Sequence, residues 1–303
     1  MRIIVTGGYG FIGSHFVNYV LENTNDEVVI IDNMTYAANK NNVRHEVEHI
    51  NKDIRLLTEE DLKPYTYDCI VHFAAESHVD NSISNGKPFV MTNVEGTYNL
   101  IELARKNLRL NKFLHISTDE VYGDMEDYDD GVCSNEEFSI KGSSYYSATK
   151  AASDMLVEAA GRTFGLPYLI TRTCNNYGEN QHLEKFIPKV IRSIKEGLTI
   201  PVYGDGCQIR EWIHADDNSA AIYKLLVSDK IKEVYNIGSG ERYKNIDIIN
   251  YLSDLIGKPV DFNFVTDRLG HDRRYSLNCD KFKSNFSDIQ NVSFKEWLKK
   301  MIV

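Results

Sequence analysis

The chain has 303 residues and a net charge of −10, with 42% hydrophobic and 26% charged residues, which is ordinary for a globular protein. This length allows one large domain or two fused domains with a substantial core. The acidic charge argues against nucleic-acid or anionic-membrane partners, and no apolar run is long enough for a membrane span. The five cysteines are odd in number and widely spaced, which predicts reduced thiols in a cytoplasm rather than disulfides or a zinc site.

The first half of the chain alternates short, almost continuously apolar runs with amphipathic segments. Such runs are typical of strands in a parallel sheet that is covered on both faces. Strands are expected at 2–6, 27–32, 49–54, 68–74, 112–117 and 167–173. Helices are expected at 12–22, 88–107 and 146–161. The alternation predicts a doubly wound, Rossmann-like α/β domain over residues 1–173.

A glycine-rich turn follows the first expected strand. Gly7, Gly10 and Gly13 have a G-x-x-G-x-x-G spacing, a variant of the dinucleotide fingerprint that brings a pyrophosphate to a helix N-terminus. Asp32 ends the second expected strand, where a carboxylate binds both ribose hydroxyls. No arginine stands immediately beside it for a 2′-phosphate, so the pattern predicts NAD rather than NADP. Ordinary turn glycines and a helix-capping aspartate are the alternatives.

Two carboxylates end the fifth expected strand, in the sequence Thr118-Asp119-Glu120. Adjacent carboxyls can divide acid and base duties in an elimination, although they could also simply cap the loop. Tyr146 and Lys150 lie four residues apart on one face of an expected helix. We expect the ammonium to lower the tyrosine pKa from its ordinary value of about 10, which makes Tyr146 a candidate general base.

After about residue 174 the alternation becomes less regular. Helices are expected at 185–196, 246–256 and 294–301, with another opening at Asp216, and strands at 200–203 and 234–238. Residues 174–211 and 235–303 are expected to form a smaller α+β substrate-binding domain, while 212–234 return to the first domain. The acidic segment 124–130 is expected to be a solvated loop. His72 and His78 lack a cluster of further ligands, so packing or substrate contact is expected for them, and no metal.

Taken together, these residues resemble the extended short-chain dehydrogenase/reductase family, and within it the nucleotide-sugar 4,6-dehydratases. Thr-Asp-Glu at the strand end is specific to this dehydratase group, whereas Tyr-x-x-x-Lys marks only the superfamily. The resembling segments follow one another over nearly the whole chain: TGGYGFIGSH (6–15), DNMTYAAN (32–39), VHFAAESHVDNSI (71–83), HISTDEVYGD (115–124), SSYYSATKAASD (143–154), TRTCNNYGENQHLEKFIP (171–188), PVYGDGCQIREW (201–212), YNIGSG (235–240) and DRLGHDRRY (267–275).

The resemblance implies a hydro-lyase of deoxysugar biosynthesis that converts a nucleoside-diphosphate glucose, in the first place dTDP-glucose, to the 4-keto-6-deoxy sugar. Tyr146 would deprotonate the 4-hydroxyl as hydride leaves C4 for NAD, with Thr118 hydrogen-bonded to that oxygen. Glu120 would remove the C5 proton and Asp119 would protonate the departing C6 hydroxyl, after which hydride returns to C6. The family also implies a homodimer formed through the helices at 88–107 and 146–161.

The expected cofactor site comprises the glycine turn, the ends of the first strands and the catalytic helix. Its residues are Gly7, Gly10, Phe11, Ile12, Gly13, Asp32, Asn33, Thr35, Asp53, Ile54, Ala74, Ala75, Ser77, Thr92, Tyr146, Lys150 and Asn176. For the nucleotide and sugar, the resemblance implies His78, Thr118, Asn175, Glu184, Lys185, Pro201, Tyr203, Arg210, Asn236, Arg268 and His271.

The chain departs from the family pattern at a few positions. Tyr9 stands in the glycine turn in place of a small residue, Tyr145 precedes the catalytic tyrosine in place of a proline, and Leu269 replaces a proline. The loop between Gly123 and Ser143 is short, which leaves the choice between thymidine and uridine nucleotides open. A nucleotide-sugar 4-epimerase or decarboxylase, a UDP-glucose 4,6-dehydratase and a non-catalytic dinucleotide sensor remain as alternatives.

Overall fold

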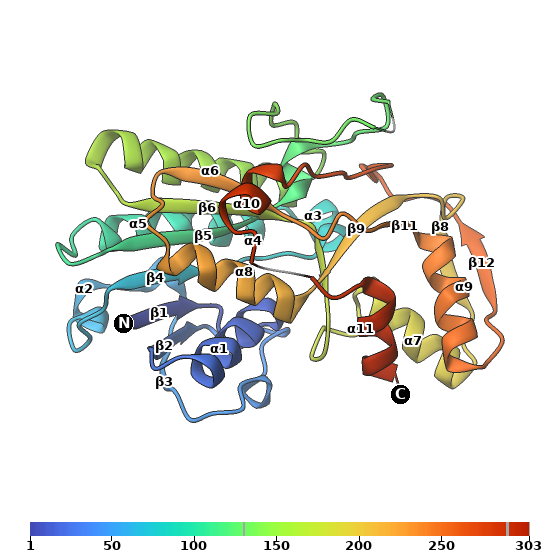
Figure 1. Cartoon of the computed structure of the whole chain (residues 1–303), viewed down its shortest axis with the longest axis horizontal. Helices are drawn as coiled ribbons and strands as arrows, with labels where there is room; N and C mark the ends of the chain where they lie inside the picture. Colours follow the sequence, from blue (N-terminus) through green and yellow to red (C-terminus); the bar gives the residue numbers. More distant parts are fainter. Residues whose placement is uncertain (130, 289–290, 303) are drawn as a thin grey trace.

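A computed structural model describes residues 1–129, 131–288 and 291–302 of the chain (Figure 1). Over these residues, seven strands form one sheet in the order β10-β6-β5-β4-β1-β2-β3, and every neighbouring pair is parallel. The order reverses between β1 and β4, which places a topological switch point at the carboxyl edge above β1. The strands are β1 (Arg2–Thr6), β2 (Glu27–Asp32), β3 (Glu48–Asn51), β4 (Cys69–His72), β5 (Lys112–Thr118), β6 (Tyr168–Thr173) and β10 (Glu233–Ile237).

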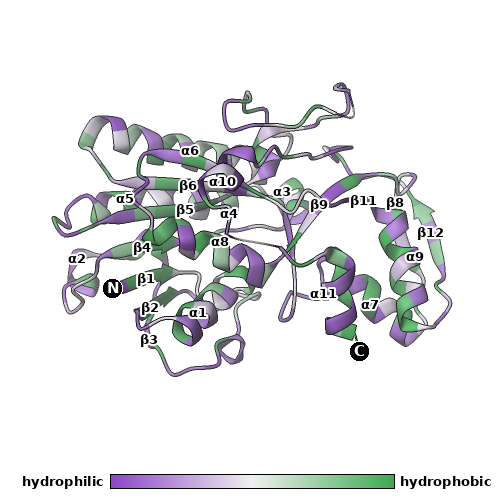
Figure 2. Cartoon of the chain, viewed as in Figure 1, coloured by the Kyte–Doolittle hydropathy of each residue, from purple (hydrophilic) through white to green (hydrophobic). Residues whose placement is uncertain are grey.

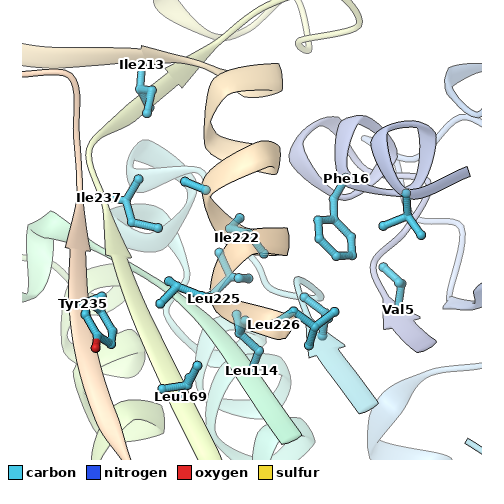
Figure 3. Packing of buried hydrophobic residues seen from close by; sticks show 14 of the residues in the cluster. Val5, Phe16, Leu114, Leu169, Ile213, Ile222, Leu225, Leu226, Tyr235 and Ile237 are labelled. Carbon is cyan, nitrogen blue, oxygen red and sulfur yellow. The ribbon is translucent and has the colours of Figure 1, made fainter. Parts of the chain in front are cut away.

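Two hydrophobic clusters cover the two faces of this sheet. On one face, α1 (Phe11–Asn23), α8 (Ala215–Val227) and α10 (Asp280–Asn285) contribute to the cluster. Figure 3 shows Ile222, Leu225 and Leu226 of α8 between the strands and Phe16 of α1. On the other face, α5 (Thr97–Ala104) and α6 (Tyr145–Phe164) pack through residues such as Leu100 and Val157. Burial on both faces explains why these strands are almost continuously apolar, as the hydropathy colouring shows (Figure 2).

A second unit lies beyond the carboxyl edge of the large sheet (Figure 1). In the described part of the chain it has a three-stranded sheet, β11-β9-β7, and a two-stranded sheet, β12-β8. A third hydrophobic cluster, which includes Trp212, joins these strands to three helices. The elements are β7 (Asn175–Tyr177), α7 (Phe186–Glu196), β8 (Ile200–Tyr203), β9 (Ile209–His214), β11 (Arg242–Lys244), α9 (Asn245–Ile256), β12 (Phe262–Val265) and α11 (Phe294–Ile302).

The expected long helix at 88–107 is divided in the structure. It consists of α4 (Lys87–Phe89), the π-helical turn η3 (Val90–Gly96) and α5. Asn93, in the π-helical turn, turns its amide toward Glu76: it accepts from the Glu76 N–H at 2.8 Å and donates to the Glu76 carbonyl at 3.0 Å. The π-helical turn thus ties the helix to the loop after β4, which lines the carboxyl edge of the sheet.

Some expected boundaries differ from the structure. Residues 235–237 belong to β10, which pairs with β6 in the large sheet, so they do not lie in the second unit as expected. The strand expected at 49–54 ends at Asn51, because the Asp53 side chain caps the 3-10 turn η2 (Ile54–Leu56). The strands β7, β9, β11 and β12 and the helix α10 were not predicted.

The start of the acidic segment also differs from the expected solvated loop. The Asp124 carboxylate accepts the backbone N–H groups of Arg273 and Arg274, and Met125 is buried. Asp130 lies outside the described residues. Among the residues that the model describes, no helix is both long and apolar enough to cross a membrane.

Candidate active site

A cavity of about 860 Å³ opens at the carboxyl edge of the large sheet, over the topological switch point. This volume is within the range of roughly 300–1,000 Å³ that is typical of ligand sites. Every residue expected to bind the cofactor lines this one cavity, and so do the five expected catalytic residues, Thr118, Asp119, Glu120, Tyr146 and Lys150.

Two glycines of the turn at one end of the cavity, Gly7 and Gly13, leave no room for a side chain. A Cβ on Gly7, whose φ is +71°, would lie 2.7 Å from the Ala74 amide nitrogen, and one on Gly13 would lie 2.2 Å from the Gly7 carbonyl oxygen. The helix α1 begins directly after Gly10, and no described side chain caps it. Its first N–H groups are therefore available to a phosphate, and the turn fits a dinucleotide pyrophosphate.

Asp32 is buried beside this turn and holds it. Its carboxylate accepts the Tyr9 N–H at 3.0 Å and the Met34 N–H at 2.8 Å. Since a carboxylate has about four acceptor positions, two of them remain for ribose hydroxyls. Asp32 caps none of the described helices, and it holds the turn through the backbone of Tyr9.

Arg55 lines the same end of the cavity and was not predicted from the sequence. It lies far from Asp32 along the chain, and only the folding of the loop after β3 brings it into the cavity. Asp53 holds its guanidinium through hydrogen bonds from Nε at 3.0 Å and from Nη2 at 2.5 Å. Because this cation is already paired with a carboxylate, the site favours the ribose hydroxyls of NAD over a 2′-phosphate.

The two strand-end carboxyls line the cavity from η4 (Asp119–Tyr122), where Asp119 is buried and Glu120 is partly exposed. Burial, followed by the charge of Glu120, raises the pKa of Asp119 well above its ordinary value. Burial also raises the pKa of Glu120, while the charges of Arg210 and Arg268 oppose that rise. The environment therefore favours a protonated Asp119 and keeps Glu120 closer to its ionised form, as an acid and a base require.

Tyr146 and Lys150 stand on α6, which Ser144 begins with a capping box. Burial and the negative charge of Glu120 raise the pKa of Tyr146, while a hydrogen bond with Thr118 lowers it. The net direction is upward, opposite to the lowering by Lys150 that the sequence predicted. Burial lowers the pKa of Lys150 itself to about 8, and its ammonium donates to the Ile116 carbonyl at 2.7 Å.

A buried polar network stands behind Lys150. His115 Nε2 lies 3.5 Å from both the Lys150 Nζ and the Asp154 Oδ1. Arg172 donates from Nε to Asp154 Oδ2 at 2.9 Å and from Nη1 to the Tyr122 hydroxyl at 3.0 Å. All of these side chains are at most a few per cent exposed. This network holds the Lys150 ammonium in place through His115. Apart from Lys150, its members were not predicted as site residues.

His72 and His78 have different surroundings: His72 is packed in the core, and His78 lies near a carboxylate. His72 is buried in β4, with Nδ1 at 2.7 Å from the Thr6 hydroxyl and Nε2 at 2.9 Å from the Thr97 hydroxyl. Burial lowers its pKa to about 3, so it is neutral. His78 begins α3 (Val79–Ser84) and lies 3.7 Å from the Glu184 carboxylate.

Three of the other expected substrate residues also line the cavity, namely Asn175, Glu184 and Lys185. The Glu184 carboxylate accepts the Tyr36 hydroxyl at 3.1 Å, and Lys185 Nζ donates to the Ser77 carbonyl at 3.1 Å. Asn176, expected near the nicotinamide, lines the cavity and accepts from Asn218 at 2.9 Å. Tyr36 also lines the cavity and was not predicted as a site residue.

A polar cluster of the second unit, formed by Tyr203, Arg268 and His271, adjoins the cavity without lining it. Arg268 donates from Nη1 to the Asp80 carboxylate at 2.8 Å, and the hydroxyl of Tyr203, on β8, donates to the same carboxylate at 3.4 Å. His271 pairs with Asp267 at 2.6 Å, and burial lowers its pKa to about 4. The Arg268 charge acts on both Glu120 and Lys185, so the cluster is within electrostatic reach of the strand-end carboxyls.

Arg210 and Pro201 complete the expected set in this unit. The Arg210 guanidinium is almost fully buried against the Tyr275 ring, donates to the Asp272 carbonyl at 2.7 Å, and acts on Glu120 through its charge. Pro201 is exposed on β8, two residues before Tyr203.

Asn236 is not among the residues that line the cavity, and its expected substrate contact stays a prediction. It is fully buried in β10, accepts the Tyr122 hydroxyl at 2.7 Å, and donates to the carbonyls of Ser134 and Asn278 at 2.9 and 3.0 Å. Its amide is fully used in holding the segments after β5 and β10 together.

A family model described as the NAD dependent epimerase/dehydratase family matches residues 3–238. The low-salt glycan biosynthesis protein Agl12 of Haloferax volcanii is 46% identical, over 94% of this chain and 92% of that protein. A dTDP-glucose 4,6-dehydratase of Haemophilus influenzae is 40% identical, over 100% of this chain and 97% of that protein. The crystal structure of DesIV, a dTDP-glucose 4,6-dehydratase from Streptomyces venezuelae with NAD bound, superposes with a TM-score of 0.93 at 40% identity, over 100% of this chain and 96% of that one.

Proposed function

Because the chain belongs to the NAD dependent epimerase/dehydratase family, we propose that it dehydrates a nucleoside-diphosphate glucose to the 4-keto-6-deoxy sugar, with dTDP-glucose as the substrate. One observation carries the proposal beyond the family. Asp119 is buried and Glu120 is partly exposed at the end of β5, and both line the same cavity as Tyr146 and Lys150. A simple alcohol oxidation or a 4-epimerisation needs the tyrosine and lysine, whereas an elimination also needs a second base and an acid.

The residues of the cavity fit NAD. Gly7, Gly10 and Gly13 would receive the pyrophosphate and Asp32 the ribose hydroxyls, while Lys150 would hold the nicotinamide ribose. When bound, NAD accepts hydride from C4 and later supplies it to C6, and its positively charged ring favours the phenolate of Tyr146.

Tyr146 begins the reaction by taking the proton of the 4-hydroxyl. Its own surroundings hold the phenol protonated, since burial and Glu120 both raise its pKa. The cation of Lys150, on the same face of α6, opposes this effect. The Thr118 hydroxyl also acts to lower the pKa of Tyr146.

The strand-end pair then performs the elimination. A ketone at C4 acidifies the C5 proton, which Glu120 removes. Asp119, whose pKa is raised well above its ordinary value, protonates the hydroxyl that leaves C6 as water. The proton on Glu120 finally returns to C5, so that carboxylate ends as it began.

Two arginines of the second unit would hold the diphosphate. Arg210 and Arg268 present guanidinium groups, whose planar forks match phosphate oxygens. Asp80 now binds Arg268, so the diphosphate competes with a carboxylate for this cation. These local cations offset the net charge of −10, which repels an anionic substrate.

The proposal is tested by incubating the purified protein with dTDP-glucose and, separately, with UDP-glucose. A product lighter than its substrate by one water supports the dehydratase, and the nucleotide that reacts faster settles the substrate. An isomer of unchanged mass identifies an epimerase instead. If the protein binds NAD but converts neither substrate, the result favours the alternative of a non-catalytic dinucleotide sensor.

We further propose a homodimer and a cytoplasmic location. The helices η3, α5 and α6 carry exposed apolar side chains, including Val90, Tyr98 and Met155, which are 49%, 54% and 61% exposed. A second copy would bury these side chains in an isologous contact. Light scattering at micromolar concentration checks the dimer, and a Met155→Glu variant should shift it toward monomer.

Five free cysteines support the proposed cytoplasmic location, because thiols stay reduced in that compartment.

A further inference from the structure

Two basic side chains, Lys52 and Arg55, follow β3 and line the end of the cavity where Asp32 would bind the adenosine ribose of NAD. This inference rests on that placement of the cofactor, which belongs to the proposed function, and not on the sugar that is dehydrated. Asn51 pairs with Asp32 in the sheet, and the Lys52 N–H donates to the Asp32 carbonyl at 3.2 Å. The lysine therefore starts beside the ribose that carries the additional 2′-phosphate in NADP.

Each of these two cations is paired with a carboxylate. Arg55 donates from Nη2 to Asp53 at 2.5 Å. Lys52 donates from Nζ to Asp61, which belongs to the short helix α2 (Glu59–Leu62), at 2.6 Å. Asp53 lines the cavity, whereas Asp61 is not among the described residues that line it. The Lys52 charge is thus bound by a carboxylate that lies outside the cofactor site.

Asp61 is itself held in place by Thr58, the residue before α2. Its Oδ2 accepts the Thr58 N–H at 2.8 Å and the Thr58 hydroxyl at 2.5 Å, in addition to the Lys52 ammonium. The hydrogen bonds from Lys52 and Thr58 lower the pKa of Asp61 to about 2, so the carboxylate is ionised near neutral pH. The Lys52 and Asp61 side chains are 31% and 23% exposed, so water screens the pair only in part. Asp61 therefore gives Lys52 a permanently charged partner.

We propose that Asp61 is a specificity residue for the cofactor, which acts by holding Lys52 away from the 2′-phosphate of NADP. A phosphate on the ribose would meet the negative charge of Asp32 and two cations that already have partners. NAD has no phosphate at this position and loses nothing from the pairing. Without the Asp61 charge, the flexible stem of Lys52 would let its ammonium turn toward the ribose. The rejection of NADP thus depends on a carboxylate outside the cavity as well as on Asp32.

The test compares the affinities of the whole chain for NAD and NADP. Displacement of bound NADH, followed through its fluorescence, measures both affinities without any turnover. Asp61→Asn removes the charge and keeps an oxygen that can accept from Thr58. This change should tighten NADP binding about tenfold, the effect of a newly available charge-assisted hydrogen bond, and change NAD binding less than about twofold. The gain should shrink as the salt concentration rises. NADP should still bind more weakly than NAD, because Asp32 remains.

Glu60→Gln is the matched control, because it removes one charge from the same helix, and Glu60 and its partner Lys63 have side chains 80% and 72% exposed. It should leave both affinities unchanged, and adding Lys52→Gln to Asp61→Asn should abolish the gain. The role of Asp61 is refuted if Asp61→Asn leaves NADP binding unchanged or weakens both cofactors equally. It is also refuted if the gain survives the loss of Lys52 or appears in Glu60→Gln. Conversion of dTDP-glucose is a separate measurement: a protein with the expected affinities but no dehydrated product would contradict the proposed reaction and not the role of Asp61.

Discussion

Arg172→Met removes one partner of the most deeply buried ion pair near the active site. The Arg172 and Asp154 side chains are 3% and 0% exposed, and their nearest atoms are 2.9 Å apart. Breaking such a pair costs about 3–5 kcal/mol, because an uncompensated charge remains in the core. The charge of Lys150 also stabilises the Asp154 carboxylate, so we expect the lower end, about 3 kcal/mol. Typical domains have a free energy of unfolding of only about 5–15 kcal/mol, so this loss is large.

Urea unfolding followed by circular dichroism measures the loss. Arg192→Met is the matched control, because the Arg192–Glu196 pair has side chains 53% and 48% exposed and should contribute only about 0.2–1 kcal/mol. The pKa of Asp154 is already raised by burial, and losing the guanidinium raises it further. The folded state then binds a proton more readily than the unfolded state, so the variant loses stability as the pH rises from mildly acidic to neutral. Equal losses for the two variants, or a loss that grows toward acidic pH, would refute the assignment of an uncompensated buried carboxylate.

Catalytic and cofactor residues give further expectations. Glu120→Gln should oxidise C4 but stall before water loss, with turnover reduced about 10²–10⁴-fold and reduced nicotinamide visible by absorbance. Tyr146→Phe should show no such absorbance, and the division of duties is wrong if both variants look alike. Asp119→Asn should slow water loss to a similar degree, which mass spectrometry of the product follows. Gly13→Ala should weaken NAD binding at least tenfold by calorimetry, because its Cβ would lie 2.2 Å from a carbonyl oxygen. Asp32→Ala should weaken NAD binding and also lower the melting temperature, since two N–H groups lose their acceptor.

Local sequence predicted the parts of the site that lie on single elements. The glycine turn, Asp32 and the strand-end carboxyls each stand next to an apolar strand, and parallel strands bring their carboxyl ends to one edge. Arg55 could not be found in this way, because its proximity to Asp32 depends on the path of a loop. The contacts of Asn236 were also hidden from the sequence, because the Tyr122 hydroxyl and the two carbonyls that it binds lie far from it along the chain.

The sequence could not predict that the surroundings raise the pKa of Tyr146. The spacing of Tyr146 and Lys150 correctly placed both residues on one helix, α6. The spacing alone gave no information on the burial of the phenol or on the charge of Glu120, and both of these raise the Tyr146 pKa. Short strands such as β7 and β11, each three residues long, were missed because their pairing partners lie far along the chain.

The interleaving of the two units has a consequence for how the protein can be cut and how it unfolds. The chain leaves the large sheet after β6, comes back through α8 and β10, and leaves again, so neither unit is one continuous stretch (Figure 1). A fragment that stops at residue 173 would lack the edge strand β10. It would also lack the side chains of Ile222, Leu225 and Leu226, which cover one face of the sheet. Such a fragment would expose a broad apolar surface and aggregate. The intact chain should instead melt in one cooperative step, and a protease nick between the units should leave both halves associated.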